Sequence, residues 1–461
     1  MVDLQDAHHA EATLRAPARA LSVVAPPTSP EAAGRTPSPE AADRTSGIRA
    51  SVLIIVQNLP VPFDRRVWLE CRALRDAGYH VSVVCPRGPG DPAEETVEGV
   101  TLYKYRPARG GNGTLAFLRE YAYSFVATAW LCAKAWRRER FDVLQACNPP
   151  DIFWPLALLA RLRGVTFVFD HHDLCPELFE SRFPGGGRAA LWGLRALEWC
   201  TYRSARHVIA TNDSYRDVAL RRGGKRHHEV TVVRTGPDPD QLRAVPPLPE
   251  LRRGRAHLVA YLGVMGPQDG VDLALRAAAH VVHVLHRQDI AFTLMGSGDC
   301  LPELTALRDE LGLGDVVEFT GRVPDGTVAQ VLSTADVALC PDPKNPLNDL
   351  STMNKTMEYM TFSLPVVAFD LRETRVSAGD AAVYAAPNDV ADYACRIVDL
   401  VDDPARRKAM GRIGRARILE VLSWPHQRDE YLGVYGALTA PPSLGRSRKD
   451  KEVVVRPGLA G

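Results

Sequence analysis

The sequence predicts an α/β protein with two doubly wound, Rossmann-like domains that face each other across a crevice. A length of 461 residues suits two domains better than one. Short apolar runs alternate with longer helical patterns, as they do in βαβ units. A proline-rich, charged break at 244–257 interrupts this alternation, which then begins again and so marks the border between the two halves.

The first half is expected to form a domain over residues 49–245. Residues 1–48 precede it and are rich in Ala, Pro, Ser and charged residues, which predicts a disordered extension. Several of the apolar runs are apolar on both faces, as parallel strands buried between helices are. The strands are expected at 51–56, 80–85, 141–147, 166–170, 207–210 and 230–233, with helical spacing at 66–78 and 189–203.

The second half is expected to form a domain over residues 257–422. Its strands are expected at 258–262, 291–295, 316–319, 337–340 and 365–369. A helical stretch at 423–438 follows the second domain and could pack back on the first domain, tying the halves together. Residues 439–461 are polar and predict a disordered tail.

The charge balance and the cysteines restrict the functional class. With 56 basic and 55 acidic residues the net charge is +1, which argues against an overall grip on nucleic acid. The nine cysteines are scattered and contain no C-x-x-C, which favours a reducing compartment over a disulfide scaffold. The basic stretches at 137–138 and 221–228 are attributed to surface solvation.

No segment reads as a signal peptide or as a membrane span, so we expect a cytoplasmic protein. The longest apolar run, 121–133, is followed by Lys134, Trp136 and two arginines. A partly buried helix is one interpretation of this segment. The alternative is a peripheral contact with the inner face of the cell membrane, made by apolar, Trp and Arg side chains.

The site is expected between the domains. In open α/β sheets, ligands bind beyond the carboxyl ends of the strands. Two such edges that meet across a hinge make a site that can close. The loops that follow strands are therefore where functional residues are sought.

The segment 341–370 carries the strongest signal. It reads as a strand end, a proline-rich loop, a helix start with Ser351 and Thr352 as expected N-cap residues, and a further buried strand. A helix amino end offers unpaired N–H groups and the positive end of a dipole, which suits a diphosphate. Lys355 and Glu358 share one helix face, where Lys355 would neutralise phosphate and Glu358 would accept hydrogen bonds from ribose hydroxyls. The alternative is a surface ion pair worth about 0.2–0.5 kcal/mol.

The stretch EYMTFSLPVVAFD (358–370) resembles the E-A-M-A-x-G-x-P-V-V-A signature of the large retaining family-4 glycosyltransferases. Residues 292–342 resemble the donor-domain block that precedes this signature, and residues 58–86 resemble an acceptor-domain opening of one bacterial branch. The resemblance covers about residues 50–438. It implies the GT-B fold, a nucleotide-diphosphate sugar donor, retention of configuration and no required metal. We expect a glycan or lipid-linked acceptor and no other cofactor.

The chain departs from this family pattern at three positions. Leu350 stands where a glutamate is usual, and the adjacent Asp349 could take over its contacts to the sugar hydroxyls. Val264 and Asp269 stand where the family has an Arg and a Lys. The diphosphate would then be met by Lys355 and other groups. The donor-binding set implied by the resemblance is Gly263, Gly266, Gly296, Arg322, Asp349, Ser351, Thr352 and Asn354.

The Gly-x-x-Gly loop that contains Gly263 and Gly266 has a simpler alternative. Such a loop also occurs as an ordinary turn between a strand and a helix, and the pattern alone is weakly specific.

A second group of candidate residues directly follows the strand at 166–170. His172 and Asp173 match the loop in which the family has a histidine that points toward the transferred sugar. A histidine there can hydrogen-bond a hydroxyl or shield positive charge that develops on the sugar ring. A structural loop is one alternative. Another is a metal site formed by His171, His172, Asp173 and Glu177.

Two further segments invite a functional interpretation. Asp238-Pro239-Asp240 formally matches the D-x-D metal–diphosphate pattern, but the central proline favours a turn. Asp64, Arg65 and Arg66 precede an amphipathic helix at a place where the resemblance puts acceptor contacts, with Arg66 facing an anionic acceptor such as a lipid diphosphate. The alternative is a helix start at which Asp64 serves only as the N-cap.

Two rival functions remain open on this sequence. A nucleotide-sugar epimerase could share the two-domain shape and would turn over the donor without an acceptor. A nucleotide-sugar-binding protein without catalytic activity would account for Leu350, Val264 and Asp269.

Overall fold

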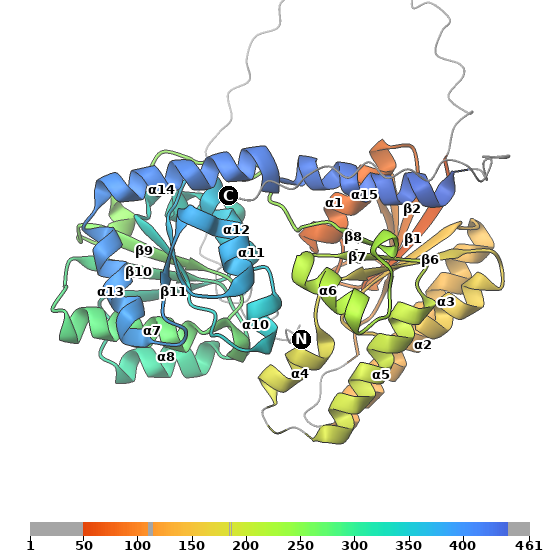
Figure 1. The fold of residues 1–461 in the computed structure, drawn as a ribbon, viewed down its shortest axis with the longest axis horizontal. Coiled ribbons are helices and arrows are strands. Elements are labelled where there is room, and N and C mark those ends of the chain that lie inside the picture. The colour runs from red at the N-terminus through yellow and green to blue at the C-terminus, as the bar shows by residue number, and fades with distance from the viewer. Residues whose placement is uncertain (1–48, 109–113, 184, 186, 441–461) are drawn as a thin grey trace, which may run out of the picture.

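The computed structural model describes residues 49–108, 114–183, 185 and 187–440, with the side chains of 114–118 left out. The expected disordered segments, 1–48 and the tail from 441 on, lie outside the described residues. Two α/β domains lie side by side, each built on a mainly parallel sheet covered by helices (Figure 1). The fold class predicted from the sequence is therefore confirmed.

The first domain contains an eight-stranded sheet in the order β3-β4-β2-β1-β5-β6-β7-β8, in which only β3 and β4 pair antiparallel. Its strands are β1 (Ser51–Ile55), β2 (His80–Pro86), β3 (Glu94–Val97), β4 (Val100–Tyr105), β5 (Val143–Cys147), β6 (Thr166–His171), β7 (His207–Ala210) and β8 (Val230–Val232). The β3–β4 hairpin was not predicted. β3 lies at the sheet edge and is short, polar and partly exposed, so it lacks the apolar run that marks the other strands.

Helices cover both faces of this sheet, because alternate strand residues point to opposite sides. Val52 and Ile54 of β1 join the core under α1 (Arg65–Asp76) and α15 (Trp424–Thr439). Leu53 and Ile55 join the core on the other side. The helices of that side are α2 (Thr114–Arg138), α3 (Trp154–Arg161), α5 (Arg188–Ser204) and α6 (Asp213–Arg221), with α4 (Cys175–Arg182) and η2 (His227–Glu229) in connections.

The second domain contains a parallel six-stranded sheet in the order β11-β10-β9-β12-β13-β14. Its strands are β9 (His257–Leu262), β10 (Ile290–Met295), β11 (Val317–Gly321), β12 (Val337–Cys340), β13 (Val366–Phe369) and β14 (Ala382–Ala385). The last strand, AVYA, was not predicted, because four residues carry too little pattern to separate a strand from a loop. Its larger helices are α7 (Val271–Ala279), α8 (Leu301–Glu310), α9 (Asp325–Thr334), α13 (Val390–Val401) and α14 (Pro404–Arg417).

Shorter elements complete the second domain. They are η3 (Pro249–Arg252), η4 (Pro267–Asp269), η5 (His280–Val284), α10 (Pro346–Leu350), α11 (Asn354–Thr361), α12 (Arg372–Ala378), η6 (Gly379–Ala381) and η7 (Ile418–Leu422). Among the helices that the structure describes, none combines the length and the apolar character that crossing a membrane requires.

The chain crosses between the domains twice, and the two crossings touch. After α14 and η7 it returns to the first domain as α15, whose Tyr431 and Tyr435 lie in the core under β1 (Figure 1). At the crossings, Trp424 N–H donates to the carbonyl of Pro237 at 3.0 Å. A Cβ at Gly236 would lie 2.1 Å from the carbonyl oxygen of Leu422, so the two segments pack backbone to backbone. The two crossings therefore form one packed junction between the domains.

A second contact between the domains lies along α6 and the segment around α10. Asn212 Nδ2 donates to the carbonyl of Leu350 at 2.9 Å and to Thr352 Oγ1 at 3.0 Å. The hydroxyls of Tyr215 and Ser351 are 2.9 Å apart. The domains therefore meet here through direct hydrogen bonds.

Candidate active site

Two glycines hold the carboxyl ends of β9 and β10 against each other. Gly296 has a φ of 138°, and a Cβ there would lie 1.8 Å from the carbonyl oxygen of Gly263, so only glycine fits. Gly263 N–H donates to the carbonyl of Met295 at 3.1 Å, and Gly266 N–H donates to the Asp269 carboxylate at 3.0 Å. Both N–H groups already donate to acceptors within the domain, so neither is free to donate to a diphosphate as expected.

Lys355 lies on α11 between two carboxylates. Its Nζ is 2.7 Å from Asp342 Oδ1 and 3.6 Å from Asp269 Oδ1, and its side chain is only 10% exposed. Burial opposes the charge, but Asp342, together with Tyr261 and Asp269, outweighs it and holds the pKa of Lys355 well above its ordinary value. Burial raises the pKa of Asp269 to about 6 against the pull of Lys355. Lys355 is therefore charged and ion-paired. Its positive charge offsets the negative charge of Asp269, which stands where the family pattern has a lysine.

The expectation that Ser351 and Thr352 cap α11 is wrong. The N-cap residue is Met353, which makes no side-chain capping bond, and α11 begins at the exposed Asn354. The two hydroxyls are instead engaged by Tyr215 and Asn212 of the first domain. Their role is to join the domains, which local sequence preference does not reveal.

The positions next to the missing glutamate have structural contacts of their own. Leu350 packs against a core cluster of the first domain. Asp349 Oδ1 accepts a hydrogen bond from the N–H of Arg372 at 3.0 Å and lies 3.5 Å from Lys344 Nζ. The Asp349 carboxylate is therefore committed to the amino end of α12, and the substitution of Leu for Glu serves packing between the domains.

Arg65 reaches across the crevice. Its guanidinium lies 2.5 Å from Asp325 Oδ1 and 3.4 Å from Glu358 Oε1, while the side chain stays 58% exposed. Arg322 of the second domain stacks on the ring of Phe63 at 4.0 Å. Burial raises the pKa of Glu358, and Arg65 opposes that rise. Glu358 and Arg322 therefore face the start of α1.

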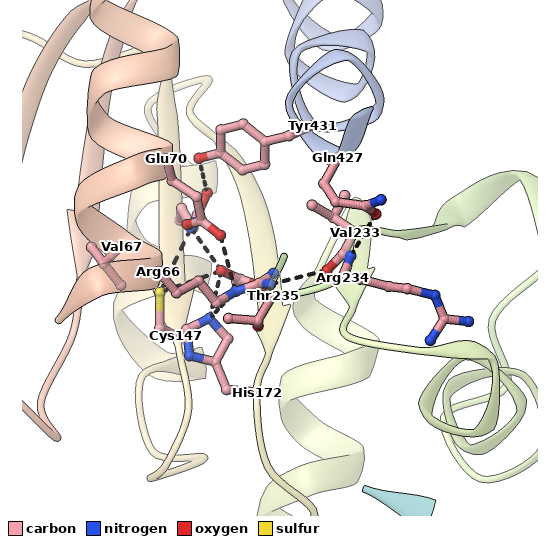
Figure 2. A network of polar contacts seen from close by, with 12 residues as sticks. Arg66, Val67, Glu70, Cys147, His172, Val233, Arg234, Thr235, Gln427 and Tyr431 are labelled. Carbon is pink, nitrogen blue, oxygen red and sulfur yellow. Dashed lines mark hydrogen bonds and ion pairs between the residues drawn. The ribbon is translucent and has the colours of Figure 1, made fainter. Parts of the chain in front are cut away.

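Arg66, the next residue, points into the first domain rather than toward an acceptor, so that expectation is corrected (Figure 2). Its side chain is 6% exposed, with Asp170 at 3.0 Å and Glu70 at 3.1 Å from its guanidinium nitrogens. Its Nη1 donates to the carbonyl of Val233 and to Thr235 Oγ1, each at 3.0 Å. Two buried carboxylates attract the guanidinium inward, whereas the sequence alone suggests an exposed basic pair.

Asp64 acts as the N-cap of α1, as the structural alternative had it. Its carboxylate accepts a hydrogen bond from the N–H of Val67 at 3.1 Å. This bond satisfies one free donor at the helix amino end. The side chain is also buried, so its contacts are internal to the domain.

His172 follows the carboxyl end of β6 and is oriented by Asp170. Its Nε2 lies 2.7 Å from Asp170 Oδ2 and 3.0 Å from Arg66 Nε. Nε2 therefore lies between the Asp170 carboxylate, which can only accept, and the Arg66 guanidinium, which can only donate, while Nδ1 has no partner among the described residues. Asn148 Oδ1 accepts from the N–H groups of His172 and Asp173, at 2.7 and 3.1 Å, and fixes this loop.

The charges around His172 are set by burial and by Arg66. Burial opposes ionisation of Asp170, but Arg66 and His172 outweigh it and hold the pKa of Asp170 below its ordinary value. Burial, followed by the charge of Asp170, raises the pKa of Glu70 well above its ordinary value. Burial also raises the pKa of Asp173. The network therefore contains one carboxylate, Asp170, that is strongly held in its charged form beside His172.

The metal site considered for His171, His172, Asp173 and Glu177 does not assemble. His171 points away, with Nδ1 3.1 Å from the Tyr202 hydroxyl, and Glu177 pairs with Arg222 at 2.6 Å. Ligand atoms of Cys147, Asp170 and His172 do lie within 4.8 Å of one another. The positively charged guanidinium of Arg66 already donates to Asp170 and to His172, so it takes up the contacts that a metal ion would make with these two residues.

The Asp238-Pro239-Asp240 segment forms a turn, as its proline indicates. Asp238 Oδ1 accepts a hydrogen bond from the N–H of Asp240 at 3.0 Å. Asp240 pairs with Arg243 at 3.0 Å on the surface. The two carboxylates are therefore engaged locally rather than directed together at a ligand.

Sequence reasoning missed four polar groups in the core of this site: Glu70, Gln145, Asp170 and Asp342. Gln145 Nε2 donates to Glu70 at 2.8 Å and to Asp170 at 3.1 Å, and its Oε1 accepts from the hydroxyls of Tyr431 and Tyr435 of α15. The signal was present in the sequence. Gln145 and Asp170 are polar residues inside apolar strands, a pattern that indicates a buried hydrogen-bond network.

Arg182, the last residue of α4, was also missed. Burial raises the pKa of Asp173 in the first domain and of Asp269 in the second, and the charge of Arg182 opposes a part of both rises. Its Nε is buried and has no hydrogen-bond partner among the described residues. Arg182 therefore lies close enough to both domains to act on Asp173 and Asp269, and its Nε–H group is available to a ligand.

Two family models match the chain. The model described as Glycosyltransferase Family 4 matches residues 64–241, and the model described as Glycosyl transferases group 1 matches residues 256–403. The 2-deoxystreptamine glucosyltransferase of Streptomyces kanamyceticus is 26% identical over 380 residues, which cover 79% of this chain and 96% of that protein. The alpha-maltose-1-phosphate synthase of Mycolicibacterium smegmatis is 28% identical over 312 residues, which cover 61% and 76%.

Solved structures share the two-domain arrangement. Sucrose-phosphate synthase from Thermosynechococcus elongatus aligns with a TM-score of 0.69 at 17% identity, covering 85% of this chain and 99% of that one. Anabaena HepE, solved in complex with UDP-glucose, aligns with a TM-score of 0.62 at 15% identity, covering 84% and 100%. The two family models, one on each domain, show that the chain belongs to glycosyltransferase family 4, and the solved structures share its GT-B fold.

Proposed function

We propose that the protein transfers a sugar from a nucleotide-diphosphate sugar to a hydroxyl of a glycan or lipid-linked acceptor, with retention of configuration. One observation carries the proposal. Arg65 and Arg66 are consecutive, and one contacts Glu358 while the other contacts the Asp170–His172 pair. A nucleotide whose ribose is held by Glu358 would therefore carry its sugar next to His172.

The residues around His172 suit the loss of a phosphate leaving group. In the proposed reaction the bond from the sugar C1 to the diphosphate oxygen breaks, and the acceptor oxygen bonds to C1 from the same face. The acceptor proton passes to the departing phosphate oxygen. His172 Nδ1 would make a hydrogen bond with a sugar hydroxyl, and the Asp170 carboxylate behind the ring would stabilise the positive charge of the transition state.

The charge of the diphosphate would be met by guanidinium groups and backbone amides. The free amides at the start of α11, together with Arg182 and Arg322, are the donors that the arrangement leaves available. Lys355 would keep the wall beneath the diphosphate from becoming anionic, because it balances Asp342 and Asp269. The proposal therefore needs no metal ion or other cofactor.

The relatives support the substrate class. A glucosyltransferase, a maltose-1-phosphate synthase and a structure holding UDP-glucose stand among the similar proteins. A UDP- or other nucleotide-activated hexose is therefore the donor to test first. The acceptor would be a glycan, a glycolipid or a polysaccharide precursor.

A contact of α2 with the inner face of the cell membrane belongs to this proposal. Tyr123, Val126 and Trp130 are exposed on one side of the helix. Lys134 and Arg138 both pair with Glu94, so one carboxylate offsets part of the positive charge at this end of α2, to which the exposed Arg137 also contributes. An enzyme held at the membrane by this contact would receive a lipid-linked acceptor from the bilayer.

The experiment is a thermal-shift panel of UDP-, GDP- and ADP-sugars on the full chain, followed by a transfer assay with the stabilising donor. We expect one donor class to raise the Tm, and Glu358→Gln to remove most of that rise. Stabilisation without any sugar release, in the presence of glycan and lipid-linked acceptors, would indicate a binding protein. Donor conversion without an acceptor would indicate an epimerase. Either result, or no stabilisation by any donor, contradicts the proposal.

A further inference from the structure

A second pocket lies at the opposite edge of the first domain's sheet. It has a volume of about 510 Å³ and is lined by the amino end of β6, the carboxyl ends of α3 and α5, and the turn before β8. His172 follows the carboxyl end of β6, whereas Thr166, which begins this strand, lines the pocket. The pocket is therefore separate from the candidate active site.

The lining of this pocket is strongly basic. Lys225 donates to the carbonyl of Ala205, and Arg226 pairs with Glu229 at 2.9 Å. Three further lining arginines have side chains that make no hydrogen bond or ion pair within the described part of the chain: Arg161, Arg203 and Arg206. Three guanidinium groups that have no carboxylate partner therefore line one pocket, whose single carboxylate, Glu229, pairs with Arg226. The basic stretch 221–228 supplies only two of the basic lining residues, Lys225 and Arg226. The fold brings the three arginines beside them from other parts of the chain.

The positive charges in the pocket repel one another. Burial lowers the pKa of Lys225, and Arg203, Arg206 and Arg226 lower it further against the pull of Glu229. Burial, Lys225 and Arg206 lower the pKa of the neighbouring His207 to about 4. Like charges held together in this way destabilise the free protein, and a bound anion would relieve the repulsion. Arginine forks match the oxygens of a phosphate group.

The surface beside the pocket is apolar and basic. Five exposed residues of α5, which follow one another at intervals of three or four, fall within about 80° of one helix face. They are Arg188, Trp192, Arg195, Trp199 and Arg203. Trp192 is 72% and Trp199 53% exposed, and Leu162, next to the pocket on the α3 side, is 82% exposed. Alternating Trp and Arg on one face is typical of helices that lie in a membrane interface.

The only acidic residue of α5, Glu198, points into the protein. Glu198 is fully buried and pairs with Arg222 at 2.6 Å. The exposed stripe of α5 therefore contains no acidic group that would repel an anionic surface. A soluble phosphate compound would occupy the basic pocket but would leave the neighbouring Trp and Leu side chains in water. A bilayer surface satisfies both features at once.

We propose that this pocket binds the phosphate of an anionic lipid headgroup while Trp192, Trp199 and Leu162 enter the bilayer interface. The inference is independent of the proposed sugar transfer, because lipid binding and transfer to a soluble acceptor are measured separately. It places a lipid-binding surface on α3 and α5, away from the candidate active site.

The test is co-sedimentation of the full chain with phosphatidylcholine vesicles, with and without phosphatidylglycerol. We expect binding only to the anionic vesicles. Since each basic residue near such a surface contributes about 1 kcal/mol, Arg203→Gln together with Arg206→Gln should weaken vesicle binding by about tenfold or more. Trp199→Ala should weaken it several-fold. The matched control is Arg412→Gln on α14, another exposed arginine without a side-chain partner in the described chain, which should bind like the wild type.

Three outcomes would overturn the proposal. The first is equal binding of the wild type to both kinds of vesicle. The second is unchanged binding of the arginine double variant. The third is stabilisation by inorganic phosphate, or binding to an oligonucleotide, without vesicle binding, which would assign the pocket to a soluble anion or to nucleic acid. An unchanged Tm of each variant shows that a loss of binding is not a loss of folding.

Discussion

Arg66 offers the sharpest test of how the site is held together. Replacing it with methionine keeps much of the side-chain volume but removes the charge that faces Asp170 and Glu70, both of which are fully buried. Because the pKa of Glu70 is raised, Asp170 is the carboxylate that would be left charged without a partner. Removing one member of a buried ion pair costs about 3–5 kcal/mol, so we expect a loss of that size in the free energy of unfolding.

The assay is equilibrium unfolding in urea, followed by circular dichroism. The control is Arg65→Met, which changes the adjacent residue on an exposed side chain and should alter the free energy of unfolding by less than about 1 kcal/mol. Combining Arg66→Met with Asp170→Asn should recover part of the loss, because the uncompensated charge disappears.

The pH dependence gives a second check on Arg66. The pKa of Asp170 is lowered in the folded protein, so its contribution to stability is present above the ordinary pKa of an aspartate and is lost as the pH falls toward the lowered value. The wild type should therefore lose more stability in acid than Arg66→Met does. A loss below about 1 kcal/mol for Arg66→Met at neutral pH, or strict additivity in the double variant, would refute the reasoning.

Four further predictions concern single residues. Gly296→Ala should cost about 3 kcal/mol or more in the free energy of unfolding, since its Cβ would overlap backbone, whereas Gly326→Ala in the open start of α9 should stabilise by about 0.5–1 kcal/mol; thermal unfolding compares the two. Burial and Arg222 lower the pKa of His171 to about 3, so the neutral ring is favoured on folding and stability falls as the pH drops from 6.5 toward 3. Between pH 6.5 and 5.0 the wild type should lose about 1.5 kcal/mol relative to His171→Phe, measured in urea, and parallel pH profiles would contradict this. His172→Ala should lower kcat by about 100-fold or more with little change in donor Kd, and a weaker donor Kd with an unchanged kcat would show a role in binding alone. Lys355→Met should weaken donor binding about tenfold by leaving buried carboxylates beneath the diphosphate, and Asp269→Asn should restore part of it; no restoration would mean that Lys355 contacts the donor itself.

The parts of the fold that could be predicted are those with continuous apolar runs. Strands such as β5 and β10 are buried on both faces and carry their pattern in the sequence itself. β3 is a polar and partly exposed edge strand, and β14 has only four residues, so both carry too little of this pattern. The position of the site at the carboxyl edges follows from the order of the elements, so the loops after β6 and β12 could be selected in advance.

The contacts inside the site depend on partners far apart in the chain, which no local pattern gives. Arg66 lies among polar residues and resembles a surface arginine, yet Asp170 draws it into the core. Ser351 and Thr352 have the composition of N-caps, yet Tyr215 and Asn212 engage them across the domains. The sequence shows Asp269 after β9 but not its partner, which is Lys355 on α11, a residue of another element.

The central claim is that one bound nucleotide sugar touches both walls of the crevice. Hydrogen–deuterium exchange of the full chain, with the donor chosen from the thermal-shift panel, measures this directly. We predict that the nucleotide sugar slows exchange both at the start of α11 and in the loop of His172 and Asp173, while the nucleoside diphosphate alone slows it only at α11. Slower exchange on one wall only, with the complete nucleotide sugar present, would contradict the claim.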